Sequence, residues 1–180
     1  MASPDTTKRP TGLALYSKAA ELSSARVIDV YSTSFGWSAK LLSGPVRRHV
    51  TNIYALVRVA DEIVDGAAAE AKEAGGRLDP GIELDALEAE TYRALDTGFS
   101  TNLVVHAFAL SARETGFGRE IIRPFFSSMR MDLTDKVHDD ESFARYVYGS
   151  AEVVGLMCLA AFIKCGGKSF ETAEKQELAR

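Results

Sequence analysis

The sequence carries no excess of positive charge, and this absence excludes one large class of function. Its 180 residues contain 21 Lys and Arg against 25 Asp and Glu, which gives a net charge of -4 with neutral histidines. Proteins that bind nucleic acid without regard to sequence need an excess of Lys and Arg to neutralise the phosphates. We therefore expect no nucleic-acid partner.

Cysteine is almost absent as well. The two cysteines, Cys158 and Cys165, are seven residues apart in an apolar segment with helical spacing. On a helix they share a face but lie too far apart along its axis to form a disulfide. The sequence therefore predicts two thiols buried in the core.

The N-terminus lacks the apolar segment of a secretion signal. Residues 1–12 are largely polar, so we expect a disordered tail and a cytoplasmic protein. One later segment, Tyr146–Ile163, is almost continuously apolar and just reaches the length of a membrane span. Glu152 stands near its centre, where a charge in lipid is costly. A buried core helix is the favoured interpretation, and peripheral membrane contact stays an open alternative.

Alternating β-type patterns and hairpin signals are also missing, whereas helical periodicity covers most of the chain. The prediction is an all-α bundle. Its helices are expected at Leu13–Tyr31, Arg47–Asp65, Gly81–Asp96, Asn102–Thr115, Ile121–Leu133 and Glu141–Cys165. Residues 66–80 are rich in Ala, Gly and Glu and predict a mobile loop or a frayed helix end, and Phe170–Arg180 resembles the start of another helix.

The expected helix Arg47–Asp65 carries the most informative pattern. At about 3.6 residues per turn, its charged groups and one phenol fall within an arc of about 100°. The members of this stripe are Arg47, Tyr54, Arg58, Asp61, Glu62 and Asp65. The stripe has no Lys and gathers three carboxylates into the last turn, where each opposes the helix dipole by about 0.3–1 kcal/mol. Helix stability therefore does not explain these carboxylates.

Asp61, Glu62 and Asp65 form a D-E-x-x-D cluster suited to a hard cation. Mg²⁺ takes oxygen ligands and usually binds through one or two carboxylates, with waters and substrate phosphates completing its shell. Arg47 and Arg58 share the stripe and are placed to hold phosphate oxygens. Two simpler interpretations stay open: the cluster is an ordinary solvated face, or the arginines pair with Asp61 and Asp65.

Several motifs taken together resemble the squalene and phytoene synthase family. The early motifs form an ungapped match: Ser32-Thr33-Ser34-Phe35, Leu41-Leu42, Arg47, Ile53-Tyr54-Ala55, Arg58 and Asp61-Glu62-Ile63-Val64-Asp65. Further on, Met129–Leu133 resembles the family's M-x-x-D element, and Tyr146–Gly155 resembles its Y-x-x-x-A-x-x-V-G element. The resemblance spans about Leu13 to Cys165.

The resemblance implies an isoprenoid-synthase-like helical bundle over residues 13–180. Members of the family join two prenyl diphosphates head to head with Mg²⁺, so geranylgeranyl or farnesyl diphosphate is the expected substrate, with Mn²⁺ as an alternative metal. NADPH is implied only for a squalene-type enzyme. Asp61, Glu62 and Asp65 would be the first metal motif, with Asp61, Asp65 and Tyr54 as catalytic residues. The expected substrate-binding residues are Ser34, Phe35, Arg47, Arg58, Asp132 and Tyr148.

One family element is missing. Relatives carry a second aspartate-rich motif on a later helix, and nothing after Cys165 supplies it. We therefore expect a bundle that is incomplete at its C-terminus. An alternative function follows: a non-catalytic protein of the same fold that binds a prenyl diphosphate, a lipid or a protein partner.

Overall fold

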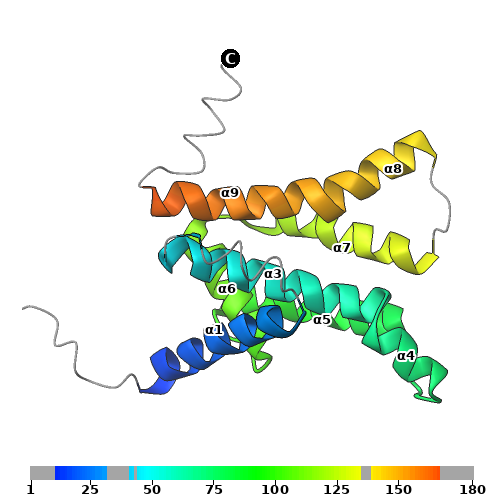
Figure 1. Ribbon diagram of the computed structural model, residues 1–180, viewed down its shortest axis with the longest axis horizontal. Helices are drawn as coiled ribbons and strands as arrows, with labels where there is room; N and C mark the ends of the chain where they lie inside the picture. The colour runs from blue at the N-terminus through cyan, green and yellow to red at the C-terminus, as the bar shows by residue number, and fades with distance from the viewer. Residues whose placement is uncertain (1–10, 32–40, 43, 135–138, 167–180) are drawn as a thin grey trace, which may run out of the picture.

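A computed structural model describes residues 11–31, 41–42, 44–134 and 139–166, and all regular structure in these ranges is helical (Figure 1). The helices are α1 (Gly12–Tyr31), α3 (Gly44–Val64), α4 (Ala67–Glu73), α5 (Pro80–Thr97), α6 (Leu103–Thr115), α7 (Arg119–Thr134), α8 (Asp140–Val147), the π-helical turn η1 (Tyr148–Glu152) and α9 (Val153–Cys165). The predicted all-α class is therefore confirmed. The tail 1–10 and the expected helix start at Phe170–Arg180 lie outside the described residues.

The bounds of α5 and α6 coincide with residues that favour the start or the end of a helix. Asn102 accepts hydrogen bonds from the backbone N–H groups of Val104 and Val105 at the start of α6. Helix α5 begins with Pro80 in its first turn, where a missing N–H costs little, and Gly98 ends it with φ of 77°. These signals explain why the predicted bounds of α5 and α6 agree with the structure to within a few residues.

The expected loop at 66–80 is partly helical. Residues Ala67–Glu73 form α4, whose side chains are not buried against the rest of the described chain. The expected helix Glu141–Cys165 is present, but a π-helical turn divides it into α8 and α9. Figure 1 shows α8, η1 and α9 running end to end along one edge of the molecule, beside α7.

Helix α3 is the central element. It contacts α1, α5, α6, α7 and α9, so different arcs of its surface meet different neighbours. The core around it is made of large buried side chains, among them Phe108, Phe125, Phe126, Ile53, Leu56, Leu84, Ile122 and Met157. Because α3 is enclosed in this way, its polar stripe meets protein as well as solvent.

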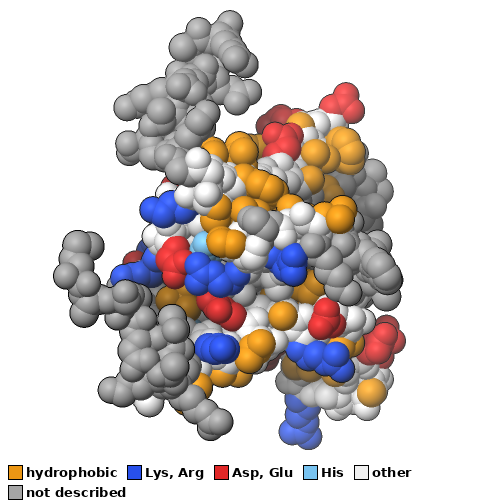
Figure 2. Space-filling model, turned by 60° about the vertical axis from the view of Figure 1, so that its left-hand side comes forward, with side chains coloured by type: hydrophobic (Ala, Val, Ile, Leu, Met, Phe, Trp, Pro, Cys, Tyr) orange, Lys and Arg blue, Asp and Glu red, His pale blue; other side chains and the backbone are white. Residues whose placement is uncertain are grey.

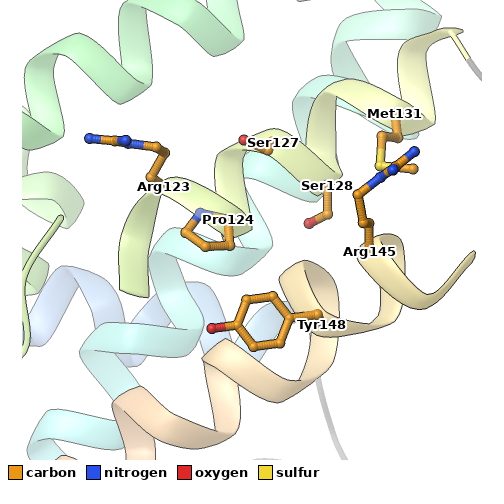
Figure 3. Close-up of a pocket in the computed structure, with 7 residues that line it drawn as sticks. All are labelled: Arg123, Pro124, Ser127, Ser128, Met131, Arg145 and Tyr148. Carbon is orange, nitrogen blue, oxygen red and sulfur yellow. The ribbon is translucent and has the colours of Figure 1, made fainter. Parts of the chain in front are cut away.

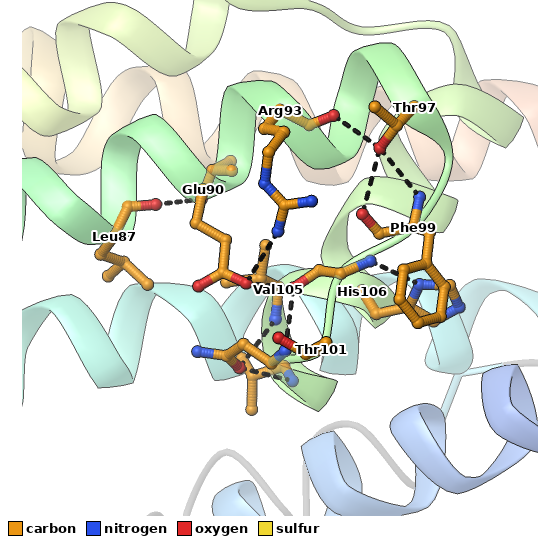
Figure 4. Close-up of polar contacts among 12 residues, drawn as sticks. Leu87, Glu90, Arg93, Thr97, Phe99, Thr101, Val105 and His106 are labelled. Carbon is orange, nitrogen blue, oxygen red and sulfur yellow. Dashed lines mark hydrogen bonds and ion pairs between the residues drawn. The ribbon is translucent and has the colours of Figure 1, made fainter.

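A polar connection fixes α5 and α6 to each other and to α1, and Figure 4 shows the part between α5 and α6. The Ser100 hydroxyl donates to Glu90 at 2.6 Å, and the Ser100 N–H donates to His106 Nδ1 at 3.4 Å. From α1, the Tyr16 hydroxyl donates to the Ser100 carbonyl at 2.9 Å, and Ser17 Oγ lies 3.0 Å from His106 Nε2. These contacts orient the helices that pack against α3.

The apolar segment near the C-terminus is only partly buried. Within the described residues, Asp140–Cys165 is one helix that length and composition would allow to cross a membrane, and 33% of its most apolar window is buried. A helix of this kind is weak evidence for a span. Its outer side exposes Leu159 and Phe162 at 42% and 46%, so the prediction of a buried core helix holds for one side only. Figure 2 shows hydrophobic side chains gathered over the upper part of one face of the molecule.

The cysteine prediction is correct in one respect and wrong in another. Both thiols are free, as expected. Cys158 packs against the core, and burial raises the pKa of its thiol to about 11. Cys165 is exposed because it is the last residue of α9, beyond the part of that helix that packs on α3.

Candidate functional site

The last two turns of α3 face α7 with carboxylates on both sides. Asp61 lies in the last turn of α3, Asp65 directly follows that helix and donates its N–H to the Asp61 carbonyl, and Asp132 lies near the end of α7. Burial raises the pKa of the Asp61 carboxyl to about 6, with Arg58 opposing the shift and the negative charges of Asp132, Asp65 and Glu62 adding to it. The structure therefore brings together three of the predicted site residues from two helices.

Tyr146 of α8 completes this group. Its hydroxyl is hydrogen-bonded to Asp132, and its pKa is raised by burial first and then by Asp132, Asp65 and Asp61. We call Asp61, Asp65, Asp132 and Tyr146 the acidic cluster. Three elements, α3, α7 and α8, contribute to it.

Sequence reasoning chose Tyr148 for this region and missed Tyr146. Two residues apart on a helix, the two side chains point about 200° away from each other. Tyr148, the first residue of η1, lines a pocket of about 490 Å³ between α7 and the end of α8, together with Arg123, Pro124, Ser127, Ser128, Met131 and Arg145 (Figure 3). Both tyrosines therefore lie beside α7, but it is Tyr146 that joins the acidic cluster.

Glu62 points away from the acidic cluster. Its carboxylate accepts a hydrogen bond from Arg58 and another, at 2.9 Å, from the Ala67 backbone N–H at the start of α4. Arg58 also lies over the ring of Tyr31, 4.7 Å from its centroid. Of the acidic residues on the stripe, the ion-pair partner of Arg58 is therefore Glu62, at the favourable i,i+4 spacing, rather than Asp61 or Asp65 as in the open alternative.

Arg47 and Tyr54 lie further along α3. Arg47 donates to the Leu42 carbonyl at 2.8 Å and precedes Asp61 by fourteen residues, about 21 Å along the helix axis. Tyr54 is half-buried beside α9, and burial followed by the nearby Cys158 raises its pKa. The structure does not bring Arg47 to the acidic cluster. Ser34 and Phe35 lie outside the described residues.

Two of the carboxylates in the acidic cluster are suitable ligands for Mg²⁺. Within the ranges that the structure describes, no three His, Cys, Asp or Glu side chains are grouped so that they could hold a metal ion. Asp61 and Asp65 nevertheless present two hard oxygen donors on one face, and Mg²⁺ is commonly held by one or two carboxylates together with substrate phosphates. The raised pKa of Asp61 also means that a nearby cation would relieve an unfavourable charge.

Comparison with known proteins agrees with the geometry. The profile of the squalene/phytoene synthase family matches residues 28–179. A 15-cis-phytoene synthase from Paracoccus sp. (strain N81106 / MBIC 01143) is 28% identical over 137 residues, which is 76% of this chain. The matched region spans 45% of that relative, so this chain corresponds to less than half of its length.

Proposed function

The chain belongs to the squalene/phytoene synthase family, and we propose that it forms part of a prenyltransferase that joins two prenyl diphosphates head to head with loss of pyrophosphate. The acidic cluster carries this proposal. Like-charged groups held together at partly buried positions are costly, and such sites are common where a protein binds a cation or a charged substrate.

We propose geranylgeranyl diphosphate as the substrate, with farnesyl diphosphate as the competing candidate. The named activity of the Paracoccus relative supports the first, because phytoene contains two geranylgeranyl units. A phytoene-type condensation needs no nicotinamide reductant, so NADPH belongs to the proposal only for a squalene-type reaction.

Asp61 and Asp65 are proposed to hold Mg²⁺, with Mn²⁺ as a substitute. When bound, the ion would neutralise the charge that develops on the departing pyrophosphate. Asp61 must be ionised to take part, and its raised pKa of about 6 leaves it largely ionised at neutral pH. The Glu62 carboxylate accepts hydrogen bonds from Arg58 and from the backbone N–H at the start of α4. We therefore propose that the metal is held by Asp61 and Asp65 without Glu62.

The remaining roles fall to side chains around the cluster. We propose that Tyr146, held by Asp132, lies beside the reacting carbons, where an aromatic face favours a cation. Tyr54 is proposed to line the same space from α3. Arg58 is proposed to contact the diphosphate by exchanging its bond to Glu62 for phosphate oxygens.

The test is Mg²⁺-dependent release of pyrophosphate from geranylgeranyl and farnesyl diphosphate. We would compare this chain with a version extended by its downstream coding sequence, each with Asp61→Asn, Asp65→Asn or the control Glu73→Gln. Glu73 is an exposed residue of α4, so its substitution makes the same change of charge away from the cluster. Activity that is lost with Asp61→Asn and Asp65→Asn but kept with Glu73→Gln supports a prenyltransferase.

Inactivity of every version with retained binding of the prenyl diphosphate would favour the alternative, a non-catalytic binding protein of the same fold.

A further inference from the structure

Gly149 lies where α7 and η1 approach most closely. It is buried inside the π-helical turn. A Cβ placed on it would lie 2.4 Å from the Pro124 carbonyl oxygen and 2.7 Å from Ser128 Cβ. Backbone cannot give way as the tip of a flexible side chain can, so a side chain here requires the two helices to separate. Moving from 2.4 Å to an ordinary contact at 3.4 Å requires a shift of about 1 Å.

This contact lies beside the acidic cluster. On α7, Ser128 precedes Asp132 by one turn, and on the other helix Gly149 follows Tyr146 by three residues. The hydrogen bond between Tyr146 of α8 and Asp132 of α7 therefore lies next to the contact between η1 and α7 at Gly149. A hydrogen bond between oxygens tolerates a change of only a few tenths of an ångström, so a shift of about 1 Å would break it.

We propose that Gly149 is a positioning residue of the acidic cluster: its missing Cβ lets η1 approach α7 closely enough for the Tyr146 hydroxyl to reach Asp132. The π-helical turn that contains Gly149 begins two residues after Tyr146. Such turns are frequent at functional sites because they change the direction of side chains within a helix. The importance of this geometry for catalysis rests on the proposed function, whereas the geometry itself can be tested without it.

The chain offers a matched control for the substitution. Gly155 lies in α9, and a Cβ placed on it meets nothing within 4 Å. Gly155→Ala therefore makes the same chemical change as Gly149→Ala on the same long helix, without a clash. Both changes raise intrinsic helix propensity equally, so a difference between them reports the contact with α7.

The experiment follows the Tyr146 side chain by ¹⁹F NMR. Protein labelled with 3-fluorotyrosine gives a Tyr146 resonance that is assigned by its loss in Tyr146→Phe. Asp132→Asn is then made in the parent chain, in Gly149→Ala and in Gly155→Ala. We expect Asp132→Asn to move the Tyr146 resonance in the parent and in Gly155→Ala, and to leave it unmoved in Gly149→Ala, where the hydrogen bond is already lost.

The proposal is overturned if Asp132→Asn moves the Tyr146 resonance by the same amount in Gly149→Ala as in the parent. If Gly149→Ala does not fold, Ser128→Thr crowds the same contact from α7 and keeps the Ser128 hydrogen bond to the Phe125 carbonyl. It is expected to uncouple Tyr146 from Asp132 in the same way, and retained coupling in a folded Ser128→Thr protein also overturns the proposal.

Pyrophosphate release by the extended protein distinguishes a failure of the Gly149 proposal from a failure of the proposed function. If the protein is a prenyltransferase, Gly149→Ala should lower kcat as much as Tyr146→Phe does, the double variant should be no worse, and Gly155→Ala should keep the parent rate. A full further loss in the double variant would count against positioning through Tyr146. A protein without any activity refutes the proposed function while the NMR result still decides the role of Gly149.

Discussion

The two ends of α3 differ in the charges that meet there. Near its start, Arg48 binds Glu21 of α1 at 3.0 Å and also binds Glu114 of α6. At its other end, Asp61 and Asp65, the residue that directly follows α3, face another carboxylate, Asp132 of α7. One end therefore joins opposite charges across helices, and the other collects like charges.

The first end also contains neutral groups that are hydrogen-bonded to one another. His49 Nδ1 lies 3.1 Å from Ser111 Oγ, and the Asn52 amide donates to the same oxygen at 3.0 Å. We call Arg48, His49, Asn52, Ser111 and their glutamates, Glu21 and Glu114, the paired network. Figure 2 shows side chains of both charges next to each other, with a histidine among them. The contrast is consistent with a paired network that supports the fold and with the ligand-binding role proposed for the acidic cluster.

The largest effect is expected from removing one charge of the acidic cluster. If the protein is the proposed prenyltransferase, Asp61→Asn should lower its kcat by about 10²–10³-fold, the usual loss when one group that stabilises transition-state charge is removed. It should not lower the free energy of unfolding, because it removes charge repulsion. Pyrophosphate release and urea unfolding measure the two effects. A large loss of stability with unchanged activity would mean that the cluster is structural.

The reverse experiment breaks the paired network. Ser111 is 1% exposed, so Ser111→Ala leaves the buried His49 and Asn52 without their shared partner. We expect the free energy of unfolding to fall by about 2 kcal/mol, as for buried polar groups that lose a hydrogen bond. Urea denaturation measures this. Ser127→Ala, the same change at an exposed position of α7, should stay within about 0.5 kcal/mol of the parent, and equal losses in both variants would refute the argument.

Much of the fold followed from the sequence, because helical periodicity and capping are local properties. The bounds of α5 and α6 depend on Asn102, Pro80 and Gly98, all of which are visible in the sequence. Periodicity also identified the polar stripe of α3. It could not say which neighbour covers each part of that stripe, because this depends on how distant segments pack.

The acidic motif illustrates this limit. Asp61 and Glu62 lie near opposite edges of an arc about 100° wide, so one meets α7 and the other meets Arg58 and α4. Tyr146 was missed for the same reason, because its hydrogen bond to Asp132 depends on how α8 packs against α7. The metal-binding and substrate-binding roles of these residues stay predictions.

A smaller effect is expected from the exposed edge of the paired network. Glu114 is 43% exposed at its side chain, so Glu114→Gln should reduce the free energy of unfolding by about 0.5–1 kcal/mol, as for partly exposed ion pairs. Added salt should weaken the difference between the variant and the parent because it screens the pair. Unfolding at low and high ionic strength checks this, and a difference that does not depend on salt would assign the loss to packing.

The smallest effects are the pH dependences, and they should have opposite signs at the two ends of α3. Burial, followed by the charge of Arg48, lowers the pKa of His49 below 6.5, so the unfolded chain binds the proton first and stability is lost as pH falls below 6.5. The pKa of Asp61 is raised from 3.8 to about 6, so the folded chain binds the proton first and stability is gained as pH falls from about 6 to 4.

Because His106 also has a lowered pKa and titrates in the same direction as His49, each contribution has to be measured as a difference between a variant and the parent. Asp61→Asn should exceed the parent in stability at pH 7, and this gap should close toward pH 4 as Asp61 itself takes up its proton. His49→Gln should be less stable than the parent at pH 8, with a gap that narrows below pH 6.5. A stability difference that did not change with pH would mean that His49 or Asp61 has the same pKa in the folded and in the unfolded chain. The contrast between the paired network and the acidic cluster would then be refuted for that residue.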